Sequence, residues 1–101
     1  MKYSHKYSKL SVSNYTTIRR YPKGKIGDIV LETYPEGKHY AKIMKIERKA
    51  LDDIYWTDLL FDTADICKTR KEAYELLQSF YKKSIDFKNE KFYIYYLKKE
   101  R

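Results

Sequence analysis

The stretch DIVLETYPEGKHYAKIMKIER, residues 28–48, decides the fold class because it predicts a β-hairpin. Residues 28–34 are mostly β-branched, leucine or tyrosine side chains, which favour a strand. The turn that follows, Pro-Glu-Gly at 35–37, combines a residue that fixes φ with one that permits positive φ. In the return strand, 38–48, the apolar residues change parity after Ile43. This change predicts either a β-bulge or a strand that is covered on both faces.

Further strands are predicted on both sides of this hairpin. Residues 9–13 alternate polar and apolar side chains, and residues 16–19 form a short extended piece rich in β-branched residues. A turn at Asn14-Tyr15 would separate the two pieces, and a loop at 21–25 contains proline and glycine. Residues 92–97 have few polar positions, so we place this closing strand in the centre of the sheet.

Between the hairpin and the last strand the apolar spacing becomes helical. Short helices are predicted at about 50–62, and Thr69 to Glu72 form a capping box. The stripe behind the box predicts a helix over residues 70–83, with Lys82 and Lys83 favourably placed at its C-terminal end. We therefore expect an α+β fold: a small curled antiparallel β-barrel with one main helix and short helices packed at its opening.

The length of 101 residues suits one domain, 1–101, with residues 1–7 as a flexible arm or an irregular opening. Cys67 is the single cysteine, which excludes an intrachain disulfide and a cysteine-cluster metal site, and we expect it to be buried. No apolar run approaches the length of about eighteen residues that a membrane span needs. No apolar segment follows the early lysines as in a secretory signal. We expect a cytoplasmic protein with no membrane partner.

The sequence predicts neither a metal site nor a cofactor. His5 and His39 are isolated from each other and have no motif spacing to Cys67, so both are interpreted as surface histidines. The aspartates between residues 52 and 65 lack the glycine and the closing glutamate of a calcium loop. We interpret them as the solvated face of a helical segment.

Positive charge is concentrated in the first half of the chain. The first twenty-seven residues contain seven Lys or Arg side chains and no carboxylate. Residues 1–49 carry a net charge of +8, whereas residues 50–101 are neutral. A cationic segment beside a neutral body is typical of a protein that binds a polyanion, and we favour a nucleic acid. The alternative is that the lysines only keep a small protein soluble.

Several short motifs in order resemble the ASCH domain superfamily, whose fold is a PUA-like β-barrel. The motifs are Thr16-Thr17-Ile18-Arg19-Arg20, the basic loop after it, Gly27-Asp28-Ile29-Val30-Leu31, the basic hairpin, and the helix from Glu72-Ala73 to Phe80-Tyr81. The resemblance covers about residues 8–98. It implies a cleft between barrel and helices, lined by the Thr-x-Arg strand and the following loop, in which family members are proposed to bind RNA or nucleotides.

The resemblance also implies a test for enzymatic activity. Some small bacterial members are amidohydrolases of acylated cytidines that use a Lys, the Thr of Thr-x-Arg and a downstream Glu, and one branch is reported to cleave RNA. Thr17 and Arg19 match Thr-x-Arg, but Asn14 stands at the Lys position, and residues 62–67 contain no Glu. We therefore assign no catalytic residue; if the protein is an enzyme, Thr17 and Arg19 are the candidates.

Arg19 and Arg20 point to opposite faces of a strand, so one of them at most lines a given cleft. If Arg19 lines it, its planar guanidinium suits a phosphate or a base edge, and Arg20 lies on the other face or beside the loop. Thr17 shares the face of Arg19, and its hydroxyl could bind a phosphate or a base. The alternatives are a surface salt bridge for the arginines and wall packing for Thr17.

The remaining candidates are three lysines and two tyrosines. Lys23, Lys25 and Lys42 are expected to converge around the loop and the hairpin and to contact phosphates. Tyr15 and Tyr21 flank the Thr-x-Arg strand and could stack on bases. The sequence thus predicts a nucleic-acid-binding protein, and the PUA-like resemblance favours RNA. A hydrolase of nucleotides or modified nucleosides, a ribonuclease, and a protein-interaction module that uses the acidic segment remain the alternatives.

Overall fold

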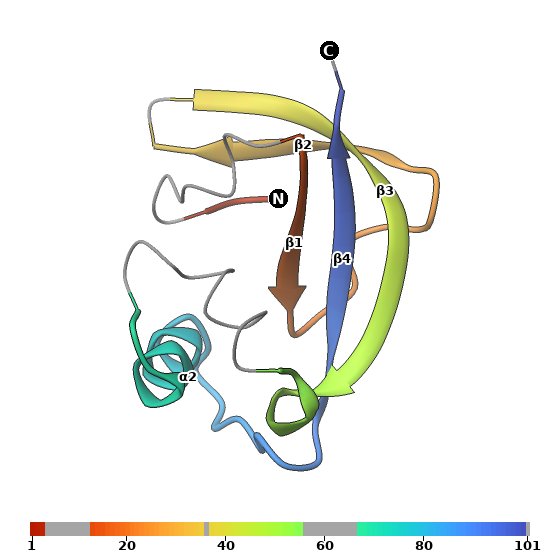
Figure 1. The fold of residues 1–101 in the computed structure, drawn as a ribbon. Coiled ribbons are helices and arrows are strands. Elements are labelled where there is room, and N and C mark those ends of the chain that lie inside the picture. The colour runs from red at the N-terminus through yellow and green to blue at the C-terminus, as the bar shows by residue number, and fades with distance from the viewer. Residues whose placement is uncertain (4–12, 36, 56–66, 101) are drawn as a thin grey trace.

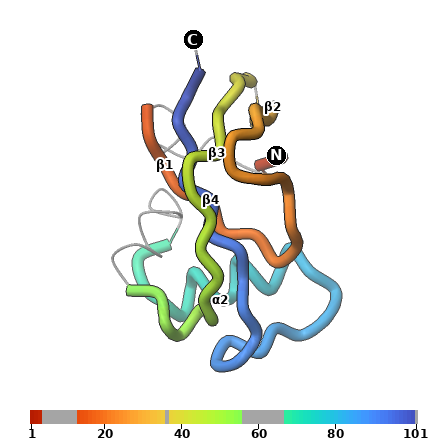
Figure 2. Tube along the Cα trace, turned by 90° about the vertical axis from the view of Figure 1, so that its right-hand side faces the viewer, coloured from red at the N-terminus to blue at the C-terminus, as the bar shows by residue number. Residues whose placement is uncertain are grey.

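The computed structural model describes residues 1–3, 13–35, 37–55 and 67–100. In chain order the elements are β1 (Asn14–Arg19), β2 (Ile29–Tyr34), β3 (Gly37–Ala50), a 3-10 helix (Leu51–Asp53), α2 (Arg70–Ser79) and β4 (Lys91–Lys99). The β2–β3 hairpin lies at one end of the molecule and α2 at the other (Figures 1 and 2). In these described ranges no helix has the length and apolar character that crossing a bilayer requires.

The four strands form one antiparallel sheet in the order β1-β4-β3-β2. The predicted hairpin is confirmed: Tyr34 pairs with Gly37 across the turn, and the register continues to Ile29 opposite Lys42. β4 is central, as expected from its apolar composition. The parity change in β3 is a β-bulge, because the pairing with β4 shifts between Ile43 and Lys45. The bulge kinks this long strand, which curls around the others in Figure 1.

The sheet curls so far that side chains of its two edge strands meet. In a flat sheet β1 and β2 would lie about 14 Å apart, because three inter-strand spacings separate them. Instead the Tyr15 hydroxyl of β1 donates a hydrogen bond to Glu32 of β2 over 3.0 Å. We call the side that carries these residues the Glu32 face. The architecture is therefore a curled antiparallel half-barrel with one helix.

The core of the Glu32 face lies inside this curl. It contains aromatic and aliphatic side chains from the N-terminal segment and from strands β1, β3 and β4: Tyr3, Tyr15, Ala41, Ile43, Tyr95 and Leu97. Gly24 packs against one end of this core. Its backbone approaches the Ile43 side chain so closely that a Cβ at this position would stand 3.0 Å from Ile43 Cδ1.

We call the opposite side of the sheet the helix face. Helix α2 covers the half of this face that lies away from the β2–β3 hairpin (Figure 1). There Ala73 and Leu77 of α2 pack with Ile18 of β1 and with Phe92 and Ile94 of β4. The Thr69 side chain accepts a hydrogen bond from the Glu72 backbone N–H, which confirms the predicted cap. Cys67 is buried in this core, also as expected.

Helix α2 is shorter than predicted, because it ends at Ser79 and not at residue 83. Its last turn is followed by 3-10-type bonds, in which the Phe80 and Tyr81 N–H groups donate to residues three positions earlier. The Gln78 amide then donates to the carbonyls of Tyr81 and Lys83 and accepts from the Ile85 N–H. The expected position of Lys82 and Lys83 in the helix end is therefore wrong.

Two further expectations are corrected near the N-terminus. Asn14-Tyr15 does not form a turn but belongs to β1, opposite Lys98 and Leu97. Residues 1–3 are no free arm, because the Tyr3 N–H donates to the Thr33 carbonyl over 2.9 Å and the Thr33 N–H to the Met1 carbonyl over 2.8 Å. Of the short helices predicted at about 50–62, a 3-10 helix is present at Leu51–Asp53, and residues 56–62 lie outside the described residues. The strand predicted at 9–13 and His5 lie largely or wholly outside them as well.

Candidate functional site

Thr17 and Arg19 share the Glu32 face, as their spacing predicts, but neither faces a cleft between sheet and helix. Thr17 is only 2% exposed and hydrogen-bonds to Tyr3. The Arg19 guanidinium stacks over the Tyr3 ring, 4.7 Å from its centroid, and donates to the Lys2 carbonyl over 3.0 Å. Both residues therefore join β1 to the N-terminal segment.

A fully buried carboxylate, Glu32, lies at the centre of this face. Its Oε1 accepts hydrogen bonds from the hydroxyls of Tyr3 at 2.8 Å and Tyr15 at 3.0 Å. Its Oε2 lies 2.7 Å from the Met1 amino group and forms an ion pair with it. The carboxylate is thus satisfied on both oxygens, which a buried charge requires.

The same network fixes the tautomer of His39. Tyr15 has one hydroxyl proton and gives it to Glu32, so His39 Nε2 must donate to the Tyr15 oxygen over 2.6 Å. His39 Nδ1 is then an acceptor, and the Tyr34 hydroxyl lies 3.2 Å from it. The donor order therefore runs Tyr34, His39, Tyr15, Glu32. The interpretation of His39 as an isolated surface histidine is wrong, because its parity on β3 directs it inward.

Burial shapes the titration of this network. It raises the pKa of Tyr3 far above its ordinary value, with the Glu32 charge as the next cause. It raises the pKa of Tyr15 in the same way, followed by Tyr3 and Glu32. Burial also lowers the pKa of His39, and the Lys99 charge adds to that effect. The neutral forms of all three side chains are therefore the ones that the fold stabilises.

This arrangement corrects the role expected of Tyr15. Its side chain is 4% exposed and its ring lies edge-on to His39, so it offers no free face to a nucleobase. The Thr17 hydroxyl is enclosed in the same core. Among the described residues Arg19 Nε is a buried donor without a hydrogen-bond partner, but the guanidinium as a whole is held by Tyr3 and Lys2.

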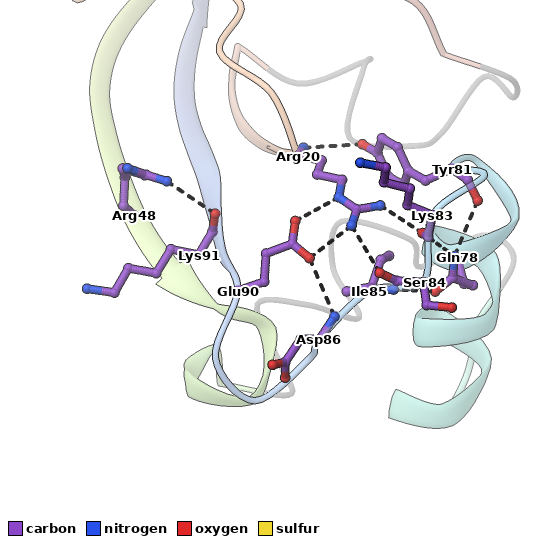
Figure 3. A network of polar contacts seen from close by, with 10 residues as sticks. All are labelled: Arg20, Arg48, Gln78, Tyr81, Lys83, Ser84, Ile85, Asp86, Glu90 and Lys91. Atoms are coloured by element: carbon purple, nitrogen blue, oxygen red, sulfur yellow. Dashed lines mark hydrogen bonds and ion pairs between the residues drawn. The ribbon is translucent and has the colours of Figure 1, made fainter.

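Arg20 points to the opposite side, as predicted, and is engaged there by the segment after α2 (Figure 3). Its guanidinium binds the Glu90 carboxylate in a bidentate pair at 2.7 and 3.0 Å and donates to the carbonyls of Lys83 and Ser84. The Tyr81 ring lies 5.4 Å below it. With this donor set occupied, Arg20 ties the end of β1 to residues 81–90 and does not present a free cation.

The loop between β1 and β2 carries Tyr21, Lys23 and Lys25. Lys23 and Lys25 are exposed, and Tyr21 is 54% exposed with its ring edge-on to Tyr81. The Gly27 N–H donates to the Ile43 carbonyl over 2.7 Å, which holds the loop alongside the part of β3 that carries Lys42. The loop and the hairpin are thus close in the backbone, but the loop packs on the Glu32 face, where the Lys23 N–H donates to the Tyr95 hydroxyl, whereas Lys42 lies on the helix face. The expected convergence of the three lysines is therefore not observed.

A groove of about 400 Å³ opens on the helix face, between the sheet and Ile54. We call it the helix-face groove. Its walls combine aliphatic side chains with a few polar ones; the described residues that line it are Asn14, Tyr15, Thr16, Ile18, Met44, Lys49, Ile54, Ile94, Tyr96 and Leu97. The Thr-x-Arg strand does form one wall, but Thr16 and Ile18 face the groove in place of Thr17 and Arg19.

Charge around this groove is positive. Tyr96 donates a hydrogen bond to Glu47, whose carboxylate also lies 3.9 Å from Lys45 Nζ and 3.8 Å from Lys49 Nζ. The Tyr96 bond lowers the pKa of Glu47, and the two lysines add to that effect. One acid is thus shared between two lysines, which leaves a net positive charge.

Lys42 and Lys98 stand directly opposite each other on β3 and β4, beside the groove residue Asn14, which pairs with Lys98. Both are exposed, and in the described part of the chain neither makes an ion pair with a carboxylate. We call them the lysine pair. The sequence did not indicate Lys98, because the bulge in β3 sets the register with β4, and only that register places Lys98 opposite Lys42.

Within the described ranges no three His, Cys, Asp or Glu side chains come together as metal ligands. The groups that line the groove or stand beside it are ammonium, hydroxyl, amide and aromatic groups, together with the Glu47 carboxylate, which Tyr96 and the two lysines already engage. Such a set suits an anionic ligand that has flat apolar surfaces and polar edges.

Comparison with known proteins gives a relative whose own name assigns it no function. No protein-family model matches the chain, and no solved structure matches it. The chain is 38% identical over 87 residues to the uncharacterized protein MJ0364 of Methanocaldococcus jannaschii, an alignment that covers 77% of this chain and 75% of the relative. At this identity and coverage, the chain belongs to the same protein family as MJ0364.

Proposed function

We propose that the protein binds RNA on the exposed half of the helix face, at the lysine pair and the helix-face groove. The lysine pair is the observation that carries the proposal. Like charges directly opposite each other in an antiparallel pair destabilise a sheet. Among the described residues neither Lys42 nor Lys98 makes an ion pair with a carboxylate that would offset this cost. A phosphate between them would remove it.

The groove supplies what a nucleobase needs. Binding sites for small flat ligands are mostly apolar with a few polar groups that fix orientation. Ile18, Met44 and Ile94 provide the apolar walls, and Asn14 and Thr16 provide groups for a base edge. The groove opens next to the lysine pair, so a base and its phosphate can be bound together.

The ASCH resemblance supports RNA over DNA by analogy, and we propose that the curled sheet is a PUA-like barrel. The supporting features are the curled antiparallel strands and the helix between β3 and β4. The proposed site lies on the face of the Thr-x-Arg strand that carries Thr16 and Ile18, whereas the expected site lay on the face of Thr17 and Arg19. No observation in the described part of the chain favours the hydrolase or the ribonuclease, since the Thr17 hydroxyl is enclosed.

The test is fluorescence anisotropy with a labelled single-stranded RNA across a salt series. Wild-type protein should bind, and the double variant Lys42→Glu, Lys98→Glu should bind weakly. Each lost phosphate contact reduces the log–log salt slope by about 0.7, so the double variant should lose about 1.4. The control is Lys82→Glu, Lys83→Glu, which changes the net charge equally on exposed residues beyond α2. Equal weakening by both double variants would leave only a nonspecific charge effect and refute the site.

A further inference from the structure

The half of the helix face nearer the β2–β3 hairpin contains an exposed tyrosine that is not part of the proposed site. Tyr40 of β3 is 57% exposed and lies directly opposite Leu31 of β2. Its neighbours two residues along β3 on this face are Lys38 and Lys42, because residues i and i+2 share a face. A cationic group thus stands on either side of the aromatic ring along the strand.

The lysine pair separates Tyr40 from the helix-face groove. Along β4 the groove residue Tyr96 is followed on the same face by Lys98 and then by Glu100, whose backbone N–H donates to the Tyr40 carbonyl over 2.8 Å. Four strand residues span about 13 Å. The order along the face is therefore groove, lysine pair, tyrosine.

We propose that the ligand of this face is a single-stranded oligonucleotide which leaves the groove, passes its phosphates over Lys98 and Lys42, and stacks a further base on Tyr40. This inference rests on the proposed function and specifies its substrate class. A ligand that places one base in the groove and stacks a second base on Tyr40 has at least two nucleotides, because each nucleotide carries a single base. A tyrosine ring can stack on any base that is not already stacked within a duplex, which selects single strands.

Charge and surface chemistry favour this occupant over a second copy of the chain. A symmetric dimer through this face would bring two lysine pairs together, and like-charge juxtaposition opposes such an interface. The apolar side chains Ile29 and Leu31 are 60% and 40% exposed and flank Lys42 and Tyr40 across the sheet. They can pack against sugars and base edges while the ammonium groups bind phosphates.

The first experiment is a length series of single-stranded RNA, from one to eight nucleotides, with a duplex of the same sequence as comparison. Affinity should rise with length until the strand spans groove and tyrosine, and then level off. The single strand should bind more tightly than the duplex. Equal affinity for a mononucleotide and the longest strand, or a preference for duplex, would overturn the inference. If the wild type bound no RNA at all, the proposed function itself would fail.

The second experiment removes the stacking surface. Tyr40→Ala should weaken binding of the full-length oligonucleotide by about 5- to 150-fold. Tyr40→Phe should bind nearly as well as wild type, because the ring remains. Tyr40→Ala should leave binding of a mononucleotide unchanged, since the groove is intact. Tyr55→Ala is the control, because Tyr55 is 76% exposed and belongs to neither part of the face.

A third variant predicts a change in the opposite direction. Glu100 is an exposed acid beside Tyr40 and would repel an approaching phosphate. Glu100→Gln should therefore tighten oligonucleotide binding, and the gain should shrink at high salt. Polyglutamate serves as competitor for an acidic polypeptide partner. Displacement of RNA by polyglutamate at lower concentration than by unlabelled RNA, or no effect of Tyr40→Ala on the oligonucleotide, would overturn the inference.

Discussion

Removal of the tyrosine hydroxyls that bind Glu32 should destabilise the fold by an amount that the structure allows us to estimate. Tyr3 and Tyr15 each donate one hydrogen bond to a fully buried carboxylate. A hydrogen bond to a charged group contributes about 1.5–3 kcal/mol, so Tyr3→Phe should lower the free energy of unfolding by that amount. Tyr15→Phe should cost at least as much, because His39 Nε2 also loses its acceptor.

The same two hydroxyls predict a loss of stability in alkali. Burial raises the pKa of both above the ordinary value of 10. The unfolded chain therefore releases these protons above pH 10 while the folded chain keeps them, so their contribution is complete below pH 10 and is lost as the pH rises further. Two such groups remove about 2.7 kcal/mol of stability between pH 9 and pH 11.

The assay is urea unfolding followed by circular dichroism, with linear extrapolation to water, at pH 8, 9 and 11. The variant Tyr3→Phe, Tyr15→Phe should lose less stability than wild type between pH 9 and pH 11, by about 2.7 kcal/mol. If it does not fold, each single variant should show half of that difference. Tyr55→Phe, on an exposed side chain, is the control and should stay within about 0.5 kcal/mol. A Tyr15→Phe protein as stable as the control, with the alkaline loss of wild type, would refute the assignment of the network.

Three other predictions concern the loop, the arginine tie and the histidine. Gly24→Ala should lower the urea midpoint more than Gly27→Ala: both glycines have positive φ, but only at Gly24 would a new Cβ press on Ile43, at 3.0 Å, and the extra cost should be about 1–3 kcal/mol. Arg20→Ala should speed hydrogen exchange at the Ile85 and Asp86 amides while leaving the α2 amides protected; unchanged exchange at Ile85 would show that Arg20 does not hold this segment. The fold lowers the pKa of His39, so the unfolded chain takes up the proton more readily and the free energy of unfolding should fall as the pH drops below 6.5. In His39→Gln the urea midpoint should change less between pH 7.5 and pH 5.5 than in the wild type. An equally steep pH dependence in that variant would place the titrating group elsewhere.

Local patterns predicted most of the elements, because each rests on neighbouring residues. The hairpin turn at 35–37, the cap at Thr69, the central position of β4 and the parity change after Ile43 all follow from spacing within a few residues. The end of α2 could not be predicted in this way. It depends on the Gln78 amide, which satisfies backbone groups of Tyr81, Lys83 and Ile85 and so replaces further helical turns.

The candidate site was predicted less well, because it depends on contacts between distant strands. The sequence assigned Tyr15 and Thr17 to a ligand, but the curl of the sheet brings them onto Glu32 and Tyr3. Composition identified Lys42, whereas Lys98 and Tyr40 become part of the same surface only through the register of β3 with its two neighbours. Alternation along one strand predicts which residues share a face, but not which face becomes buried.

A hydrogen bond from a tyrosine of one edge strand to a glutamate of the other holds the sheet in its curl. A second tyrosine, from the N-terminal segment, donates to the same carboxylate oxygen. Substitutions at these three positions should therefore co-vary among relatives. In a chain with an aliphatic residue at the place of Glu32, the two enclosed hydroxyls lose the acceptor that they share, so phenylalanine becomes acceptable at both tyrosine positions. The surface on the helix side is free of this constraint, so ligand preference can diverge there while the half-barrel stays the same.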